Sequence, residues 1–328
     1  MNRKTKIVAT IGDNEIWTDD KLTEAQNSGV DIFRMSSAHN RKDDFFKKVR
    51  LNAPNVKTLQ DLNEGVKKRI QIENDISVNN TDVVKISSQL IDDELKCLVV
   101  DWPLLYDKIR KGDIIYVGDG EVALKVTLVE DSTITSLSLN NGVIRKKKAI
   151  NVNGIESGIK AINEYNHESI ILGAKRNYDY VAISFVSLAS DIDDFWKVVK
   201  TTQYNYKPIV IAKIETEEGI KNIDDILKKA DGVMIARGDL ALQVDFHKLG
   251  VLQNLLLNSC KNAGKFCIVA TQMLESIIDR YIPSRAEISD ISNAVYNGAN
   301  AVMLSPESCI NPRPIKAIET MKRIIIEV

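Results

Sequence analysis

The sequence predicts an α/β protein built on a closed (β/α)₈ TIM barrel, with a small β-barrel lid domain inserted between strand 3 and helix 3. Short runs rich in Val and Ile recur eight times, and an amphipathic segment follows seven of them. This alternation is typical of βα units on a parallel sheet. Eight such units match a closed barrel better than an open doubly wound sheet.

The eight predicted strands are short, and each is bounded by polar or turn-forming residues. They occupy residues 6–11, 31–36, 56–62, 180–186, 208–215, 232–236, 266–271 and 301–305. Several of the helices between them begin with a recognisable cap. Thr18 or Asp20 caps the first, Thr216 opens the helix after the fifth strand, and Ser284 precedes a helix that stops at Gly298.

One interval, between the third and fourth strands, breaks the βα rhythm. Residues 70–154 combine alternating apolar residues with turn signals at 118–120 and 140–142. We therefore expect a barrel of residues 1–69 and 155–328, with 70–154 as the inserted lid domain. The insertion follows the carboxyl end of a barrel strand, the face where active sites of such barrels lie. The alternative, an insertion with no part in the chemistry, stays open.

The composition of the chain argues against several classes of function. The chain has 328 residues and 44 basic against 45 acidic residues, so its formal net charge of -1 favours neither nucleic acid nor an anionic membrane. Its four cysteines form no CxxC pair and it has only three histidines, which argues against a zinc site and against a disulfide framework. The charged start "MNRKTKIVATIGDNE" lacks the apolar stretch of a signal peptide. We expect a cytoplasmic protein.

The stretch "VIAKIETEEG", residues 210–219, places an ammonium and a carboxylate at the end of a buried strand. Side chains alternate along a strand, so Lys213 and Glu215 share one face with Ile211. A plain ion pair on one face would account for both residues. A catalytic site becomes the better interpretation when the other strand ends are added.

Polar residues follow most of the predicted strands, and the carboxyl ends of parallel barrel strands meet at one rim. These residues are Arg34, Ser36, His39, Asp61, Lys213, Glu215, Arg237, Asp239, Thr271, Ser305 and Glu307. Glu215 and Asp239 are hard oxygen ligands suited to Mg²⁺, and Lys213 suits an oxyanion or a phosphoryl group. Gly238 lets a ligand approach the backbone, where N–H groups form an anion seat. A cap at Asp239 and a buried hydroxyl at Thr271 are the structural alternatives.

Several stretches, in their order and spacing, resemble pyruvate kinases over nearly the whole chain. They are "KTKIVATIG", "GVDIFRMSSAHN", "GDIIYVGDGEVALKV", "IAKIETEEGIKNIDDILKKADGVMIARGDLAL", "GKFCIVATQMLESI" and "PSRAEISDISNAVYNGANAVMLSPES". The resemblance implies transfer of the phosphoryl group of phosphoenolpyruvate to ADP, giving pyruvate and ATP, with Mg²⁺ or Mn²⁺. It also implies a barrel that carries an inserted β lid and is followed by a separate C-terminal α/β domain.

The resemblance implies a role for individual residues. Lys213 is similar to the family's catalytic lysine and Thr271 to the threonine near the enolate carbon. Glu215 and Asp239 are similar to its metal ligands. The backbone at Arg237, Gly238 and Asp239 is similar to the seat of the substrate carboxylate. Arg34 and Arg69 are similar to its phosphate-binding arginines, with Arg34, Ser36 and His39 on the nucleotide side.

Some positions depart from the family pattern. Ser36 and Ala38 replace an asparagine and a serine that help to bind K⁺, so we expect that K⁺ is not required. If Glu64 is an insertion, "DLNEGVKKR" places Lys67 where K⁺-independent members carry a lysine and Arg69 at the phosphate position. Without the insertion, Lys68 takes the arginine position, and this alternative stays open.

Other departures fall near the lid and the end of the chain. Tyr165 and Ser187 stand where the family has a lysine and an arginine, and Pro306 replaces a glycine. The sequence ends at Val328, where the family continues into its C-terminal domain. The expectation is therefore an enzyme without sugar-phosphate regulation and with a homodimer contact through the barrel.

Three functional hypotheses remain on these observations. The first is a pyruvate kinase that uses phosphoenolpyruvate and ADP. The second is an enzyme on the same scaffold that acts on phosphoenolpyruvate, pyruvate or oxaloacetate with a different acceptor or reaction. The third is a non-catalytic binding paralogue, which has no need of the set Lys213, Glu215, Asp239 and Thr271.

Overall fold

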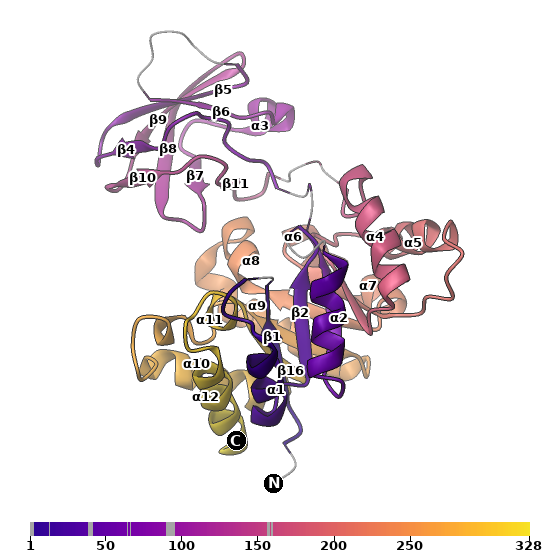
Figure 1. The fold of residues 1–328 in the computed structure, drawn as a ribbon. Coiled ribbons are helices and arrows are strands. Elements are labelled where there is room, and N and C mark those ends of the chain that lie inside the picture. Colours follow the sequence, from indigo (N-terminus) through magenta and orange to yellow (C-terminus); the bar gives the residue numbers. More distant parts are fainter. Residues whose placement is uncertain are drawn as a thin grey trace. The chain divides into compact units, whose positions relative to one another are not determined.

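The predicted (β/α)₈ barrel is confirmed by the computed structural model, which describes residues 3–12, 14–38, 42–63, 65, 67–89, 96–155, 158 and 160–328 (Figure 1). Within these residues, eight parallel strands close in the order β1-β16-β15-β14-β13-β12-β3-β2. Their bounds are β1 Lys6–Thr10, β2 Ile32–Ser36, β3 Lys57–Leu62, β12 Tyr180–Ile183, β13 Ile209–Ile214, β14 Gly232–Ala236, β15 Phe266–Ala270 and β16 Ala301–Leu304. Each strand coincides with one of the eight apolar runs of the sequence.

The inside of the barrel is filled by apolar side chains from every strand. This cluster consists of Val8, Ile32, Leu59, Ala182, Ile211, Met234, Ile268, Ala270, Ala301 and Met303. Ile211 belongs to it, and Lys213 follows two residues later on the same face of β13, in register with Met234 of β14. The inward face of β13 therefore changes from apolar to charged at the carboxyl end of the strand.

Helices connect the barrel strands. Their bounds are α1 Asp19–Ser28, α2 Asp43–Asn52, α4 Glu164–Arg176, α5 Ala189–Lys200, α6 Glu217–Lys221, α7 Ile223–Lys229, α8 Arg237–Gln243, α9 Leu249–Asn262, α10 Arg285–Tyr296, α11 Pro306–Cys309 and α12 Pro314–Ile326, with the short 3₁₀ helices η1 Phe246–Lys248 and η2 Glu275–Ile277. Across the described part of the chain, none of the helices has the length and apolar character needed to cross a membrane.

Three predicted caps are confirmed. The hydroxyl of Thr18 accepts from the backbone N–H of Lys21, and Thr216 accepts from that of Gly219. Ser284 accepts from Glu287 N–H while the Glu287 carboxylate accepts from Ser284 N–H, so α10 begins with a capping box. After α10, Gly298 adopts a φ of 96°, which a glycine tolerates without the Cβ penalty.

The chain divides into two compact units. The first comprises Met1–Glu64, Ala161–Arg237 and Gly250–Val328, and the second comprises Gly65–Lys160 and Gly238–Leu249. The expected lid bounds of 70–154 stay a prediction. They lie within the first segment of the second unit, Gly65–Lys160, and the other segment of that unit contains most of α8.

The second unit consists largely of β structure. A two-stranded sheet has the order β10-β4, and a six-stranded sheet has the order β11-β7-β8-β9-β5-β6. The bounds are β4 Ile76–Val78, β5 Val83–Ser87, β6 Cys97–Val99, α3 Pro103–Lys108, β7 Ile114–Val117, β8 Val122–Glu130, β9 Thr133–Ser138, β10 Gly142–Ile144 and β11 Ile150–Val152. This unit has a hydrophobic core of its own, which includes Val84, Leu98, Trp102, Leu124 and Ile134.

Candidate active site

A buried ionic network lies at the carboxyl ends of β2, β3, β12 and β13. Lys213 Nζ lies 3.2 Å from Asp61 Oδ1 and 3.2 Å from Glu215 Oε1, and it donates to Ser184 Oγ at 2.6 Å. Arg34 Nε donates to the other Asp61 oxygen at 2.9 Å. The network thus joins two cations and two carboxylates from three strand ends with a hydroxyl that follows β12, and Lys213 and Glu215 are 7% and 1% exposed.

Asp61 has a strongly shifted pKa within this network. Its side chain is fully buried, and burial by itself raises the pKa of a carboxyl group. The charges of Lys213 and Arg34, together with their hydrogen bonds, outweigh this effect and lower the pKa of Asp61 to about 2. Asp61 is therefore an anion at neutral pH, and it balances the charge of both cations.

Glu215 is held on both of its oxygens. Oε1 contacts Lys213, and Oε2 accepts a 2.7 Å hydrogen bond from the backbone N–H of Phe185. Phe185 lies two residues after the end of β12 and has a φ of 55°, an unusual conformation for a bulky residue. This backbone turn presents the N–H group that orients the carboxylate.

The residues of the second strand lie partly in the network. Arg34 also donates to Thr10 Oγ1 at 3.0 Å, so its guanidinium spans β1, β2 and β3. Ser36 Oγ donates to Asn63 Oδ1 at 3.1 Å. His39, the third residue expected on the nucleotide side, lies outside the described residues.

Helix α8 begins directly after β14, at Arg237. The backbone N–H groups of Gly238 and Asp239 therefore belong to the first helical turn. Within the second unit, Asp239 Oδ1 accepts from Lys67 Nζ at 2.6 Å. The Arg237 side chain is 8% exposed and contacts the loop after β15.

Two further predicted residues, Thr271 and Arg69, have other contacts. Thr271 follows β15 with a φ of 73°, a clear outlier for a β-branched residue, and its carbonyl accepts from Arg237. Arg69 belongs to the second unit, where its guanidinium donates to the Lys147 carbonyl at 2.9 Å. Among the predicted site residues, Lys213 thus contacts Glu215, and Asp61 joins Lys213 to Arg34.

The network also contains residues to which the sequence assigned no role. Asp61 was noted at the end of a strand, and a carboxylate inside the apolar run "VKTLQDL" was the signal that it is paired. Ser184 and Thr10 carry no such signal, because a single hydroxyl near a strand end is common. Neither does Phe185, whose contribution is a backbone N–H.

The donors expected to hold a metal have the right chemistry for Mg²⁺. Glu215 and Asp239 are carboxylates, and Mg²⁺ in proteins commonly binds one or two carboxylates and completes its shell with substrate oxygens and water. Each carboxylate oxygen has more than one lone pair, so an existing hydrogen bond leaves acceptor capacity. Among the residues that the structure describes, no group of three or more His, Cys, Asp or Glu forms a ready metal cage.

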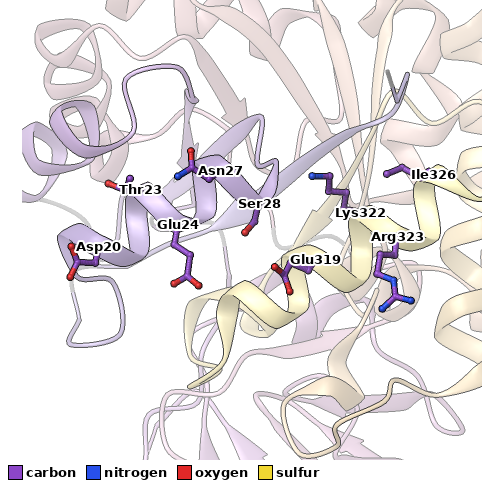
Figure 2. Close-up of a pocket in the computed structure, with 9 residues that line it drawn as sticks. All are labelled: Asp20, Thr23, Glu24, Asn27, Ser28, Glu319, Lys322, Arg323 and Ile326. Atoms are coloured by element: carbon purple, nitrogen blue, oxygen red, sulfur yellow. The ribbon is translucent and has the colours of Figure 1, made fainter. Parts of the chain in front are cut away.

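A separate groove of about 760 Å³ lies between α1 and α12 on the outside of the barrel (Figure 2). It is lined by Asp20, Thr23, Glu24, Asn27, Ser28, Glu319, Lys322, Arg323 and Ile326. Its charged side chains are of both signs. None of the predicted catalytic, substrate-binding or metal-binding residues lines this groove. We therefore do not place the active site there.

Comparison with known proteins gives a consistent answer. A family model described as the pyruvate kinase barrel domain matches residues 2–318. The chain is 34% identical over 336 residues to a pyruvate kinase of Geobacillus stearothermophilus, covering 99% of this chain and 57% of the relative. It is 32% identical over 327 residues to a pyruvate kinase of Borreliella burgdorferi, covering 99% of this chain and 68% of the relative.

A solved structure gives the same result. The crystal structure of a pyruvate kinase from Cryptosporidium parvum superposes with a TM-score of 0.89 at 29% identity, covering 98% of this chain and 68% of the other. The chain therefore spans between half and about two thirds of the length of these relatives.

Proposed function

Because this chain belongs to the pyruvate kinase family, we propose that it transfers the phosphoryl group of phosphoenolpyruvate to ADP and yields pyruvate and ATP. The observation that carries the proposal is the buried network of Lys213, Asp61, Arg34 and Glu215 at the carboxyl end of the barrel. Phosphoryl transfer demands mainly positioning and neutralisation of charge, and this network supplies both.

Each residue of the site has a role that follows from its charge and its position. Lys213 is a compact cation held in place by Asp61, Ser184 and Glu215, and it neutralises charge on the transferring phosphoryl group and the enolate oxygen. Arg34 and Arg69 bind phosphate oxygens, and Ser36 and His39 take the nucleotide side. The N–H groups at the start of α8 donate hydrogen bonds to the substrate carboxylate, and Thr271 lies where the enolate carbon gains its proton.

Glu215 and Asp239 would hold the Mg²⁺ ion. When bound, the ion supplies a Lewis acid that neutralises the oxygens of the phosphoryl group and the enolate. The contacts of Glu215 with Lys213 and with the Phe185 N–H group hold the carboxylate in one orientation after the end of β13, which suits a metal ligand.

We also propose that the reaction is independent of K⁺. Ser36 bonds Asn63, and Lys67 contacts Asp239, so a fixed ammonium lies beside one of the proposed metal ligands. The remaining expectations belong to the same proposal: residues 70–154 act as the lid, and the protein works in the cytoplasm as a homodimer through the barrel.

One assay tests the proposal. Purified protein is mixed with phosphoenolpyruvate, ADP and Mg²⁺, with and without K⁺, and pyruvate is measured. We expect turnover at similar rates in both conditions. A folded protein that binds Mg²⁺ yet forms no pyruvate in either condition contradicts the proposed reaction, whereas strong activation by K⁺ contradicts only the role of Lys67.

The Lys213→Ala variant provides the matched control for catalysis. The charge of Lys213 acts chiefly in the transition state. We therefore expect the variant to lose about 100-fold or more in turnover while it keeps the fold. Circular dichroism checks the fold. Similar turnover of variant and wild type removes Lys213 from the mechanism.

A second candidate function is supported by the residue at 187. Where the family has an arginine, Ser187 Oγ lies 2.9 Å from Thr216 Oγ1, and the Ser187 carbonyl accepts from Asn222, so a neutral hydrogen-bonded turn replaces a cation. This change favours an altered acceptor for the same phosphoryl donor. ³¹P NMR of phosphoenolpyruvate with alternative acceptors tests it: consumption that requires ADP contradicts this candidate.

A further inference from the structure

The backbone directly after β15 is held in an unusual conformation. Thr271 and Gln272 have φ values of 73° and 51°, in the left-handed region that side chains with a Cβ rarely adopt. For a β-branched residue this conformation is strained, and such strain persists only where the surroundings enforce it. The contacts around residues 271–274 identify what enforces it.

Arg237 makes the first set of these contacts. Its Nη2 donates to the carbonyl of Thr271 at 2.6 Å and to that of Gln272 at 3.2 Å, and it lies 2.7 Å from the sulfur of Met273. One guanidinium nitrogen therefore contacts three consecutive residues of the strained segment. A carbonyl direction depends on φ and ψ, so these bonds stabilise the left-handed backbone directly.

The other end of the same guanidinium is anchored elsewhere in the barrel. Nη1 donates to Asp290 Oδ2 on α10 at 2.5 Å and to Gln253 Oε1 on α9 at 3.3 Å. The planar, rigid fork of an arginine makes both sets of bonds at once, which a lysine ammonium at one point in space does not. Arg237 thus ties the loop after β15 to two helices.

Glu307 binds the backbone N–H groups of the same segment. Its side chain is fully buried, and Oε1 accepts from the backbone N–H groups of Met273 and Leu274, both at 3.1 Å. Oε2 accepts from Ser305 N–H, at the end of β16. The segment is therefore held by its carbonyl groups through Arg237 and by its N–H groups through Glu307.

We propose that the Arg237 side chain is a positioning residue for Thr271: with Glu307, it fixes the left-handed backbone that orients the threonine at the enolate carbon. This inference rests on the proposed function, in which Thr271 lies at the site of proton transfer. It gives the Arg237 side chain a role distinct from that of the backbone N–H groups that follow it in α8.

The variant Arg237→Lys tests the proposal, because it keeps the charge and removes the fork. Arg313→Lys is the matched control, since Arg313 donates to the carbonyls of Ile277, Ile278 and Arg280 at 3.3 to 3.4 Å, farther along the same loop. The first readout is exchange of the methyl hydrogens of pyruvate with D₂O, followed by ¹H NMR with Mg²⁺ and ATP present. In this exchange a C–H bond breaks to the enolate and a C–D bond forms from solvent deuterium.

We expect Arg237→Lys to slow the exchange about 10- to 100-fold, the range expected when a reacting group is misplaced, with a smaller change in KM for phosphoenolpyruvate. Arg313→Lys is expected to exchange at the wild-type rate. Wild-type exchange in Arg237→Lys overturns the proposal, as does equal slowing in both variants.

A second readout is independent of catalysis. Amide hydrogen exchange, followed by mass spectrometry, is expected to speed up at residues 271–274 in Arg237→Lys and only at 277–280 in Arg313→Lys. Unchanged protection of 271–274 in Arg237→Lys overturns the clamp. A wild-type protein that exchanges no methyl hydrogen and forms no pyruvate contradicts the proposed function instead, and the amide readout still decides the clamp.

Discussion

Asp61 is the residue on which the charge balance of the candidate site depends. It is fully buried, and it faces Lys213 through one oxygen and Arg34 through the other. A buried charge that loses a paired counter-charge is costly, because water no longer solvates it. The side chain that organises the site is thus a carboxylate to which the sequence assigned no catalytic role.

Replacement of Asp61 by asparagine should destabilise the protein strongly. The change leaves Lys213 and Arg34 without their shared counter-charge, and loss of one partner of a buried ion pair costs about 3 to 5 kcal/mol in the free energy of unfolding. Urea denaturation measures the loss. Asp225→Asn is the control, because its pair with Lys228 is exposed and solvent screens it, so we expect little change in stability; equal losses in the two variants contradict the buried network.

The same carboxylate predicts a pH dependence. Its pKa is lowered from the usual 3.8 to about 2 in the folded protein, so its contribution is present above pH 3.8 and is lost as pH falls through about 2. The unfolded chain takes up a proton in this window before the folded one does, and the contribution is on the order of 2 kcal/mol. The difference in unfolding free energy between wild type and Asp61→Asn should therefore shrink between pH 4 and 2; a constant difference contradicts the lowered pKa.

At the scale of elements, the position of α6 depends on a close approach between its backbone and the backbone at Val186. A Cβ placed on Gly219 of α6 meets the Val186 carbonyl at 2.6 Å, whereas one placed on Gly250 of α9 meets nothing within 4 Å. A helix at the position of α6 therefore requires a glycine. This helix starts at Thr216, immediately after Glu215.

We expect Gly219→Ala to lower the free energy of unfolding by about 1 to 3 kcal/mol, because the backbone has to shift to relieve the overlap. Gly250→Ala is the matched control and should raise it by up to about 1 kcal/mol, since alanine is the better helix former. Thermal unfolding followed by circular dichroism compares the two. A neutral or stabilising Gly219→Ala would show that α6 moves without cost.

The eight barrel strands could be predicted from sequence because each is a separate apolar run with local boundaries. The caps at Thr18, Thr216 and Ser284 were predictable for the same reason, since a cap bonds residues only two or three positions away. Contacts between elements were not predictable in this way. The Phe185 N–H that holds Glu215 is brought to it by pairing of β12 with β13, across 30 positions of sequence.

At the scale of the whole molecule, the chain contains two units with separate hydrophobic cores. Units with separate cores often unfold in separate transitions, which breaks the two-state approximation. Of the three tryptophans, Trp102 lies in the second unit and Trp17 and Trp196 in the first. Each unit therefore has its own fluorescent reporter.

We expect the two reporters to give different urea midpoints. Trp102→Phe leaves only the first unit's tryptophans, and the double variant Trp17→Phe, Trp196→Phe leaves only Trp102. Circular dichroism of both variants controls for changes in overall stability caused by the substitutions. Coincident midpoints by all probes would show that the two units unfold as one.

Taken by itself, the sequence determined the barrel and the family, since periodicity and local motifs carry that information. It also singled out Lys213, Glu215 and Arg34, because charged residues at the ends of apolar runs stand out. Only the tertiary structure decided that Asp61 balances Lys213 and Arg34 and that Arg237 clamps Thr271. Those contacts join strands and helices far apart in the chain, and their geometry arises only when the barrel closes.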